Sequence, residues 1–340
     1  MKRYFWIFKW IVVSHMLVMS HAYAGTLSTA SDMKSPVRVF HFVLRGVEIE
    51  RASWMVKEAR KEGFNAVQVL LTDGVRLDHA PWQPLPDAWS KEDFLSWVND
   101  VRNQGLEVIP EIKLLTHQEK FYQDRQPGLM FNQSTYDPRK EETYQRVFSL
   151  LGEIIEAIHP KAIHIGHDEV AGINAGSKKK WLREGEEMIP AVLFLKDIFR
   201  IHDYLKQRHI QMWMWGDMLI SPEEFPKMLS THLHGFNPGY GKPLREKLPR
   251  DIVICDWHYF DDQVDFPSLS VMQTEGFRVI GATWKTEKTI RNFSRYGSQH
   301  GAYGMMATTW FHVQRKEWDT VDSIIRLSGE IFIKDFPNAK

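Results

Sequence analysis

This chain has one cysteine and a formal net charge of zero, and each of these features argues against some classes of function. The one cysteine in 340 residues, Cys255, lies inside an apolar run and has no partner for an intrachain disulfide. We expect it to be a buried small hydrophobic residue and not a nucleophile. Lysine plus arginine and aspartate plus glutamate both number 43, and no basic run contains interleaved aromatic residues. The charge pattern therefore predicts no nucleic-acid partner and no binding to an anionic membrane surface.

A stretch typical of a targeting signal lies near the N-terminus. Basic residues, a mostly apolar run and a small-x-small site follow one another as Lys2, Arg3 and Lys9, then Ile11–Met19, then Ala22-Tyr23-Ala24. This order predicts that residues 1–24 are a signal peptide cleaved after Ala24, and hence a periplasmic or secreted protein. Ser14 and His15 interrupt the run, which is short for a bilayer span. A retained anchor is the alternative, and we expect no stable membrane insertion after cleavage.

Short β-rich runs alternate with amphipathic helical patterns over residues 36–340, after a short segment at residues 25–35. The predicted strands are Val37–Leu44, Ala66–Leu71, Glu107–Leu114, Ala162–Ile165, Gln211–Trp215, Ile252–Tyr259, Arg278–Trp284 and Tyr303–Trp310. The predicted helices are Ser53–Lys61, Lys91–Gln104, Glu142–Ile158, Ala191–Arg208, Thr289–Gln299 and Trp318–Ile333, with a weaker pattern near Pro222–Ser230. Eight β–α units without a repeat or linker predict an α/β protein, a single-domain (β/α)8 TIM barrel rather than an open doubly wound sheet.

Titratable and tryptophan side chains occur at or just after the end of every predicted strand. Along the chain these are Arg45; Asp73; Glu111 and His117; Asp168 and Glu169; Trp215 and Asp217; Asp256 and Trp257; Trp284 and Lys285; and Trp310 and His312. In a barrel the carboxyl ends of all strands lie on one face, which carries the active site. Packing or a simple hydrogen bond explains any one of these residues, but their joint occurrence predicts a functional site. The 13 Trp and 20 Phe suit a sugar-binding cleft, although a large core explains them equally well.

The fourth strand ends in two adjacent carboxylates. The stretch Lys161–Val170 reads KAIHIGHDEV, so an apolar strand runs into Gly166 and then presents Asp168 and Glu169. Neighbouring residues at a strand end point in different directions, so the two acids can hold different protonation states. One then orients a substrate while the other transfers a proton. A solvated acidic pair at a helix start is the alternative, because carboxylates favour that end of the helix dipole.

The same stretch resembles the signature of glycoside hydrolase family 20, the β-N-acetylhexosaminidases. The family's H-x-G-x-D-E element, the specific part of the match, appears as His164-Ile165-Gly166-His167-Asp168-Glu169. Weaker matches follow the family's order: Leu71-Thr72-Asp73, Pro110-Glu111-Ile112 with His117, Asp137-Pro138 with Glu142-Thr143-Tyr144, and Met214-Trp215-Gly216-Asp217-Met218. The last is most similar to stand-alone members of the hexosaminidase D type. The resemblance covers most of the predicted barrel.

The resemblance implies a role for each matched residue. Glu169 would be the general acid/base, and Asp168 would orient the substrate's 2-acetamido group, whose carbonyl oxygen replaces an enzyme nucleophile. Arg45 would bind sugar hydroxyls, while Asp73 and His117 would lie beside Glu169. Further candidates for binding the sugar are Trp215, Trp257 and Trp310 as pocket walls, with His167, Asp217, Trp284, Lys285 and His312. The implied partner is a carbohydrate with a terminal N-acetylhexosamine; neither a cofactor nor a metal is implied, and the oligomeric state is left open.

Three positions depart from the family pattern. His167 stands where a second glycine is usual, Lys285-Thr286-Glu287 replaces Tyr-x-Asp, and His312 replaces a glutamate. A histidine can donate a hydrogen bond where a carboxylate only accepts, so the groups expected at the sugar's 4- and 6-hydroxyls change. We therefore expect hydrolysis of both N-acetylglucosaminides and N-acetylgalactosaminides. Many members also carry an N-terminal sandwich domain, for which residues 25–35 leave no room.

Two other classes of function fit parts of the pattern. A metal-dependent barrel hydrolase could use His117, His164, His167 and Asp168, but His164 and His167 are three residues apart on a strand and so face opposite ways. A non-catalytic glycan-binding barrel would keep the tryptophan walls, yet it has no need for Glu169 beside Asp168.

Overall fold

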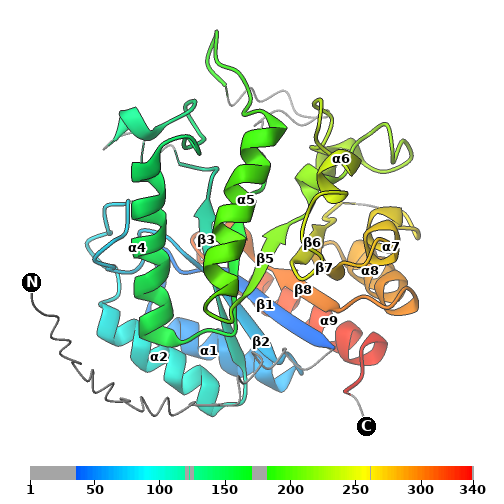
Figure 1. Ribbon diagram of the computed structural model, residues 1–340. Coiled ribbons are helices and arrows are strands. Elements are labelled where there is room, and N and C mark those ends of the chain that lie inside the picture. The colour runs from blue at the N-terminus through cyan, green and yellow to red at the C-terminus, as the bar shows by residue number, and fades with distance from the viewer. Residues whose placement is uncertain (1–35, 119–121, 123–125, 171–181, 261, 339–340) are drawn as a thin grey trace, which may run out of the picture.

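The computed structural model describes residues 36–118, 122, 126–170, 182–260 and 262–338. Its eight parallel strands form a closed barrel in chain order, and the first strand pairs with the last as well as with the second (Figure 1). The predicted single (β/α)8 TIM barrel is thus confirmed. The predicted signal peptide, residues 1–24, and the segment 25–35 lie outside the described residues.

The strands are β1 (Val37–Val43), β2 (Ala66–Leu71), β3 (Glu107–Leu114), β4 (Ala162–Gly166), β5 (Gln211–Trp215), β6 (Val253–Trp257), β7 (Arg278–Thr283) and β8 (Gly304–Thr308). Every predicted run overlaps its strand. The last three predictions extend too far, because Tyr259, Trp284 and Trp310 favour strands by propensity but lie in the loops that follow β6, β7 and β8. These loops belong to the face where the candidate site lies.

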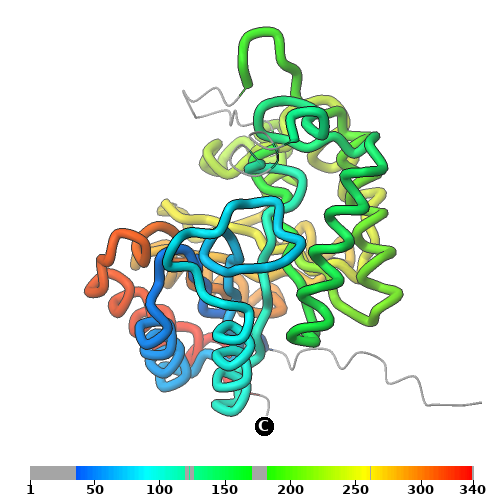
Figure 2. Tube along the Cα trace, turned by 90° about the vertical axis from the view of Figure 1, so that its left-hand side faces the viewer, coloured from blue at the N-terminus to red at the C-terminus, as the bar shows by residue number. Residues whose placement is uncertain are grey.

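The described residues form the helices α1 (Ile49–Lys61), α2 (Lys91–Asn103), α4 (Glu141–Ile158), α5 (Ala191–Lys206), α6 (Lys242–Arg245), α7 (Pro267–Thr274), α8 (Glu287–Gln299) and α9 (Trp318–Asp335). The α9 helix packs against both α8 and α1, so the last and first helices are neighbours. Helices α4 and α5 stand side by side in both views (Figure 2), and the rings of Phe148 and Tyr204 stack between them at 4.3 Å. No helix within the described part of the chain has the length and apolar character needed to span a bilayer.

The connection from β5 to β6 differs from the prediction. Residues 222–229 form turns instead of a helix and lead into a short 3-10 helix at Ser230–His232. Pro226 explains the difference, because proline lacks a backbone N–H and also disfavours helical backbone in the residue before it. The only α-helix described in this connection is the single turn α6. The sequence also gave no prediction for α7, whose 8 residues are too few for a clear helical pattern.

Apolar side chains form two layers, one inside the barrel and one between the barrel and the helices. The side chains of β5 show the alternation that separates them: Trp213 and Trp215 belong to the inner layer, Met212 and Met214 to the outer one. Cys255 is fully buried in the inner layer, as predicted, and burial raises the pKa of its thiol well above its usual value. The packed interior leaves the carboxyl ends of the strands as the face available for a site.

Candidate active site

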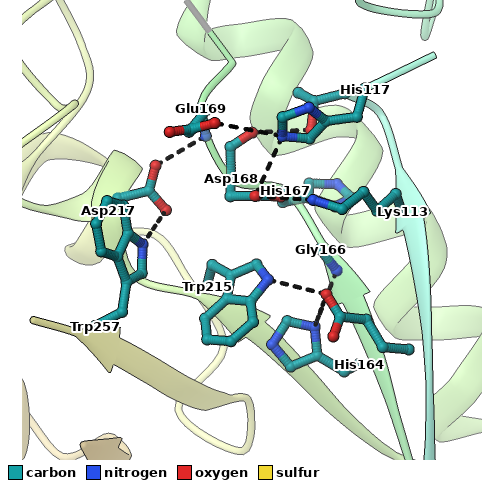
Figure 3. A network of polar contacts seen from close by, with 12 residues as sticks. Lys113, His117, His164, Gly166, His167, Asp168, Glu169, Trp215, Asp217 and Trp257 are labelled. Atoms are coloured by element: carbon teal, nitrogen blue, oxygen red, sulfur yellow. Dashed lines mark hydrogen bonds and ion pairs between the residues drawn. The ribbon is translucent and has the colours of Figure 1, made fainter. Parts of the chain in front are cut away.

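The turn after β4 has an unusual backbone. Gly166, His167 and Glu169 have positive φ angles of 74°, 66° and 50°. Glycine suits Gly166 for a second reason, because a Cβ there would lie 3.3 Å from Lys113 Cα on β3. His167 and Glu169 are not glycines, so tertiary contacts must hold their backbone in the left-handed region. This turn presents Asp168 and Glu169 (Figure 3).

The two carboxylate oxygens of the buried Asp168 have different surroundings. Oδ2 lies 3.2 Å from Lys113 Nζ and 3.2 Å from His117 Nε2, whereas Oδ1 has no hydrogen-bond partner among the described residues. Burial alone would raise the pKa of Asp168, but Lys113 and then His117 hold it well below its usual range. Asp168 is therefore an anion with one buried acceptor still open.

Glu169 has surroundings of the opposite kind. Its side chain is 30% exposed, and its Oε2 lies 3.7 Å from His117 Nε2. Burial raises the pKa of Glu169; His117 opposes this shift and Asp168 adds to it. A carboxyl group with a raised pKa keeps its proton to higher pH, so Glu169 is suited to donate one. The two adjacent acids thus have pKa shifts of opposite sign.

Asp217, which follows β5, holds the backbone of Glu169. Its Oδ2 accepts from the Glu169 N–H at 2.8 Å, and its Oδ1 accepts from Trp257 Nε1 at 3.3 Å (Figure 3). The same Oδ2 lies 2.7 Å from His234 Nδ1. Burial would lower the pKa of His234, but the bond to Asp217 raises it. One carboxylate thus links the loops after β4 and β5 to the end of β6, and its bond to the Glu169 N–H helps to hold the positive φ of that residue.

A second buried carboxylate, Glu111 of β3, lies deeper in the barrel. Glu111 is 3.0 Å from His41 Nε2 and accepts from Gln68 Nε2 at 2.7 Å and from Trp215 Nε1 at 3.1 Å. Burial would raise the pKa of Glu111, but His164 and then His41 lower it to about 2. Burial lowers the pKa of His164 itself to about 4. Both oxygens of Glu111 thus have partners, and one of them holds the indole N–H of Trp215.

Aromatic rings extend from Trp215 to the rim of the barrel. Trp215 and Trp310 lie 5.6 Å apart, Trp310 and Tyr259 lie 6.3 Å apart, and Tyr259 stacks on Trp257 at 4.9 Å and meets Trp284 at 5.9 Å, all between ring centroids. Trp257 and Trp310 are partly exposed, whereas Trp215 is fully buried. The rings offer the flat apolar faces, with polar edges, that a sugar ring can pack against.

One set of described side chains has the spacing of metal ligands. Atoms of His117, Asp168 and Glu169 lie within 4.8 Å of one another. The Lys113 ammonium bonds to the same Asp168; burial would lower the pKa of Lys113, but Asp168 and then Glu111 raise it. A divalent cation would therefore have to bind beside a lysine cation, so this set suits proton transfer better than metal binding.

The family of the chain follows from comparison with known proteins. Residues 47–325 match the model of the glycosyl hydrolase family 20 catalytic domain. The chain belongs to glycosyl hydrolase family 20. A search of curated proteins found no match to it.

Solved structures of family 20 proteins share the fold at low sequence identity. The chitobiase of Flavobacterium johnsoniae superposes with a TM-score of 0.62 at 13% identity, over 88% of this chain and 49% of that one. The β-N-acetylhexosaminidase of Bacteroides fragilis gives 0.61 at 16%, over 87% and 65%. A mutant β-hexosaminidase of Streptomyces plicatus, in complex with the product GlcNAc, gives 0.59 at 12%, over 87% and 63%. This chain therefore spans 49–65% of the length of these three relatives.

Arg45 and Asp73, both predicted from the family 20 resemblance, form an ion pair at the rim of the barrel. Arg45 Nη2 lies 3.3 Å from Asp73 Oδ2, and the Arg45 side chain is 39% exposed. The loops that carry them touch, since a Cβ on Gly74 would lie 2.8 Å from Arg45 Cα. His117 is also in the cluster, but its Nε2 is nearer to Asp168 (3.2 Å) than to Glu169 (3.7 Å).

His167 does not face the substrate side of the family 20 turn, which corrects its prediction as a substrate-binding residue. It is fully buried, with Nε2 2.9 Å from Asp197 Oδ2 and Nδ1 3.1 Å from the Ile165 carbonyl. Asp197 of α5 also accepts from the hydroxyls of Tyr136 and Tyr144, at 3.0 and 2.8 Å. The side chain points toward the helix layer and contacts Asp197 of α5, whereas His164 lies beside Trp215 and Glu111 in the barrel interior. The two histidines therefore face opposite ways, as predicted.

The departures from the family pattern near β7 and β8 have partners of their own. His312 is buried and bonds to Glu317, and its ring lies 5.3 Å from Trp284. Lys285 Nζ lies 4.9 Å from the centroid of the Trp284 ring. Glu287 opens α8 and accepts from Arg291 Nε at 2.8 Å, so it does not support the expectation that it reads a sugar hydroxyl. For Trp284, Lys285 and His312, sugar binding stays a prediction.

The sequence reasoning missed Lys113, His234 and Asp197. Lys113 lies two residues after Glu111, and strand alternation could have placed both on the inner face. Asp197 shares the helical spacing of the buried Phe194 and Ile198, which is an unusual position for an acid. His234 lies in an irregular loop, where no period exists to point it out.

Proposed function

We propose that the protein removes terminal N-acetyl-β-D-hexosamine residues from glycans by substrate-assisted, retaining hydrolysis. The observation that carries this proposal is the unequal pair at the end of β4. Asp168 has a pKa well below its usual range and Glu169 has a raised pKa. An anion beside a proton donor is the combination that such a reaction needs.

Glu169 acts as the general acid/base in this scheme. It protonates the glycosidic oxygen as the bond to the anomeric carbon breaks, and the resulting carboxylate later takes a proton from the attacking water. Its partial exposure leaves room for a leaving group. The bond from its N–H to Asp217 keeps the side chain in position through both steps.

Asp168 orients the 2-acetamido group. Its carboxylate accepts the acetamido N–H, which directs the acetamido oxygen to the anomeric carbon, and its negative charge stabilises the oxazolinium intermediate. Oδ1, which is buried in the free protein, has no hydrogen-bond partner among the described residues. Nearby carboxylates are already engaged: Asp217 contacts Glu169, His234 and Trp257, and Glu111 contacts His41, Gln68 and Trp215. Neither is free to be the nucleophile of an ordinary retaining glycosidase, which supports the substrate in that role.

The terminal sugar binds against the partly exposed Trp257 and Trp310, above the buried Trp215. Arg45, paired with Asp73 and 39% exposed, supplies donors for sugar hydroxyls at the rim. The protein carries out this reaction in the periplasm or outside the cell. The basic, apolar and small-residue order of residues 1–24 supports this location.

A panel of aryl glycosides tests the function. The wild-type protein should hydrolyse aryl N-acetyl-β-glucosaminide and leave aryl β-glucoside almost untouched, since a 2-hydroxyl cannot replace the acetamido oxygen. Similar rates on the two substrates would rule out substrate assistance. Binding of N-acetylglucosamine without turnover of any aryl N-acetylhexosaminide would favour the non-catalytic glycan-binding barrel.

A further inference from the structure

Lys113 places an ammonium group in the candidate active site. The mechanism proposed above gives this group no role. The side chain, near the end of β3, is 15% exposed, and its Nζ lies 3.2 Å from Asp168 Oδ2. Among the described residues, Asp168 is the sole carboxylate within ion-pair distance of this ammonium. On its other side the ammonium lies 5.7 Å from the centroid of the Trp310 ring, one of the rings proposed to hold the sugar.

An irregularity in the sheet directs Lys113 to the catalytic turn. Glu111 pairs with His164 and Leu114 pairs with Gly166, so the register between β3 and β4 shifts in this interval. Three steps along β3 correspond to two along β4, as in a β-bulge, and bulges next to active sites re-aim side chains. The close approach of Gly166 to the Lys113 backbone fits the same arrangement. The path of the main chain therefore places Lys113 beside the turn that carries Asp168.

The two oxygens of Asp168 differ in their contacts. Lys113 and His117 both contact Oδ2, whereas Oδ1 is buried and has no hydrogen-bond partner among the described residues. We propose that Lys113 is a positioning residue for Asp168: its bond to Oδ2 fixes the carboxylate in the orientation in which Asp168 receives the 2-acetamido group of the sugar. This inference rests on the proposed hexosaminidase function.

The charge of Lys113 also acts on the ionisation of Asp168. The charged and titratable groups that interact with this carboxylate are Lys113 from β3, His117 from the next loop, Glu169 beside it, His234 after β5, Tyr259 after β6 and His164 in the barrel. Asp217 acts on the neighbouring Glu169, and Glu111 acts on Lys113. Lys113 is the strongest influence that favours the anion. Without it, burial would be opposed chiefly by His117, so the pKa of Asp168 would rise. Activity that needs the anion would then be lost at a higher pH.

Lys113→Met tests the proposal, with Lys113→Arg as the conservative variant and Lys247→Met, on an exposed lysine far along the chain, as the matched control. The pH profile of kcat/KM is measured on an aryl N-acetyl-β-glucosaminide. For Lys113→Met we expect the acid limb to move up by about 1–3 pH units, with kcat lowered more than KM is raised. Lys113→Arg should restore most of the wild-type limb, and Lys247→Met should match the wild type.

A second readout follows Asp168 without turnover. The carboxyl carbon of Asp168 is titrated by carbon-13 NMR, with Asp168→Asn to assign the signal. An upward shift of its midpoint in Lys113→Met supports the proposal even if the wild type hydrolyses no hexosaminide, which would refute the proposed function alone. Unchanged acid limb and unchanged Asp168 midpoint would overturn the role of Lys113. If Lys113→Met does not fold, Lys113→Gln, which keeps a donor and removes the charge, decides by the same two measurements.

Discussion

Glu169→Gln should separate the acid role of this side chain from its structural role. Glutamine has nearly the same size as glutamate, and the bond that holds residue 169 runs from its backbone N–H to Asp217 Oδ2 at 2.8 Å. The turn should therefore keep its conformation in the variant. What the variant loses is the proton that the raised pKa of Glu169 keeps available for the leaving group.

The size of the loss should depend on the leaving group. General acid assistance contributes roughly 10²–10⁴-fold, which corresponds to about 2.7–5.5 kcal/mol of transition-state stabilisation. A poor leaving group needs this proton, so kcat/KM for an unactivated glycoside should fall by that factor. A nitrophenolate leaves without protonation, so the activated glycoside should lose much less.

The pH dependence of activity provides a second test of the acid role of Glu169. Glu169 must be protonated to act as the acid, so wild-type activity should fall as the pH rises through its pKa. Because that pKa is raised, the fall should come at higher pH than for an ordinary glutamate. Asp168 must be ionised, and its lowered pKa should preserve activity well into the acid range. In Glu169→Gln the alkaline fall should disappear.

The assay compares kcat/KM for two aryl N-acetyl-β-glucosaminides of different leaving-group pKa, in the wild type, in Glu169→Gln and in Glu92→Gln, an exposed glutamate of α2. The control should match the wild type on both substrates. Equal loss on both substrates in Glu169→Gln, or an alkaline fall that persists, would remove Glu169 from the acid role.

Three further outcomes follow from the same structure. Asp168→Asn should slow N-acetyl substrates by roughly 10²-fold or more and weaken competitive inhibition by a thiazoline mimic of the intermediate, because the developing positive charge loses its carboxylate; unaltered thiazoline affinity would contradict this role. Chelators should leave activity intact, because the Lys113 cation is bonded to Asp168, one member of the His117, Asp168 and Glu169 cluster; activity lost in chelator and restored by zinc would support a metal-dependent hydrolase. Asp197→Ala should lower the free energy of unfolding by about 3–5 kcal/mol, because it strips partners from the buried His167, Tyr136 and Tyr144. Urea unfolding measures this cost against Asp203→Ala, whose side chain is 73% exposed on the same helix, and equal stability of the two variants would refute it.

The strands and most helices could be predicted because their physical cause is local. In β5, for example, tryptophan and methionine alternate along Gln211–Trp215, and this alternation matches the inner and outer faces of the strand. The prediction failed where the local signal conflicts with the tertiary structure. Near Pro222–Ser230 a weak helical pattern contains Pro226, and at Trp284 and Trp310 aromatic residues with strand propensity serve in loops instead.

For the candidate site, the sequence predicted which residues lie near one another but not where each side chain points. A barrel brings the residues after every strand to one face, so the neighbourhood of Asp168, Glu169, Trp257 and Trp310 followed from their order in the chain. The direction of each side chain did not. His167 lies beside Asp168 in sequence, yet a positive φ of 66° accompanies its contact with Asp197 behind the strand.

The sequence by itself determined the barrel, the family signature and the pair of adjacent acids, because these depend on residue type and spacing along one chain. Only the tertiary structure decided how the two acids differ. Lys113 reaches Asp168 across the β3–β4 register shift, and Asp217 reaches the Glu169 backbone from the loop after β5. Burial and charge act through space, so a pKa depends on groups that are remote in sequence. For this reason the opposite pKa shifts of Asp168 and Glu169 emerge only when the strands are assembled.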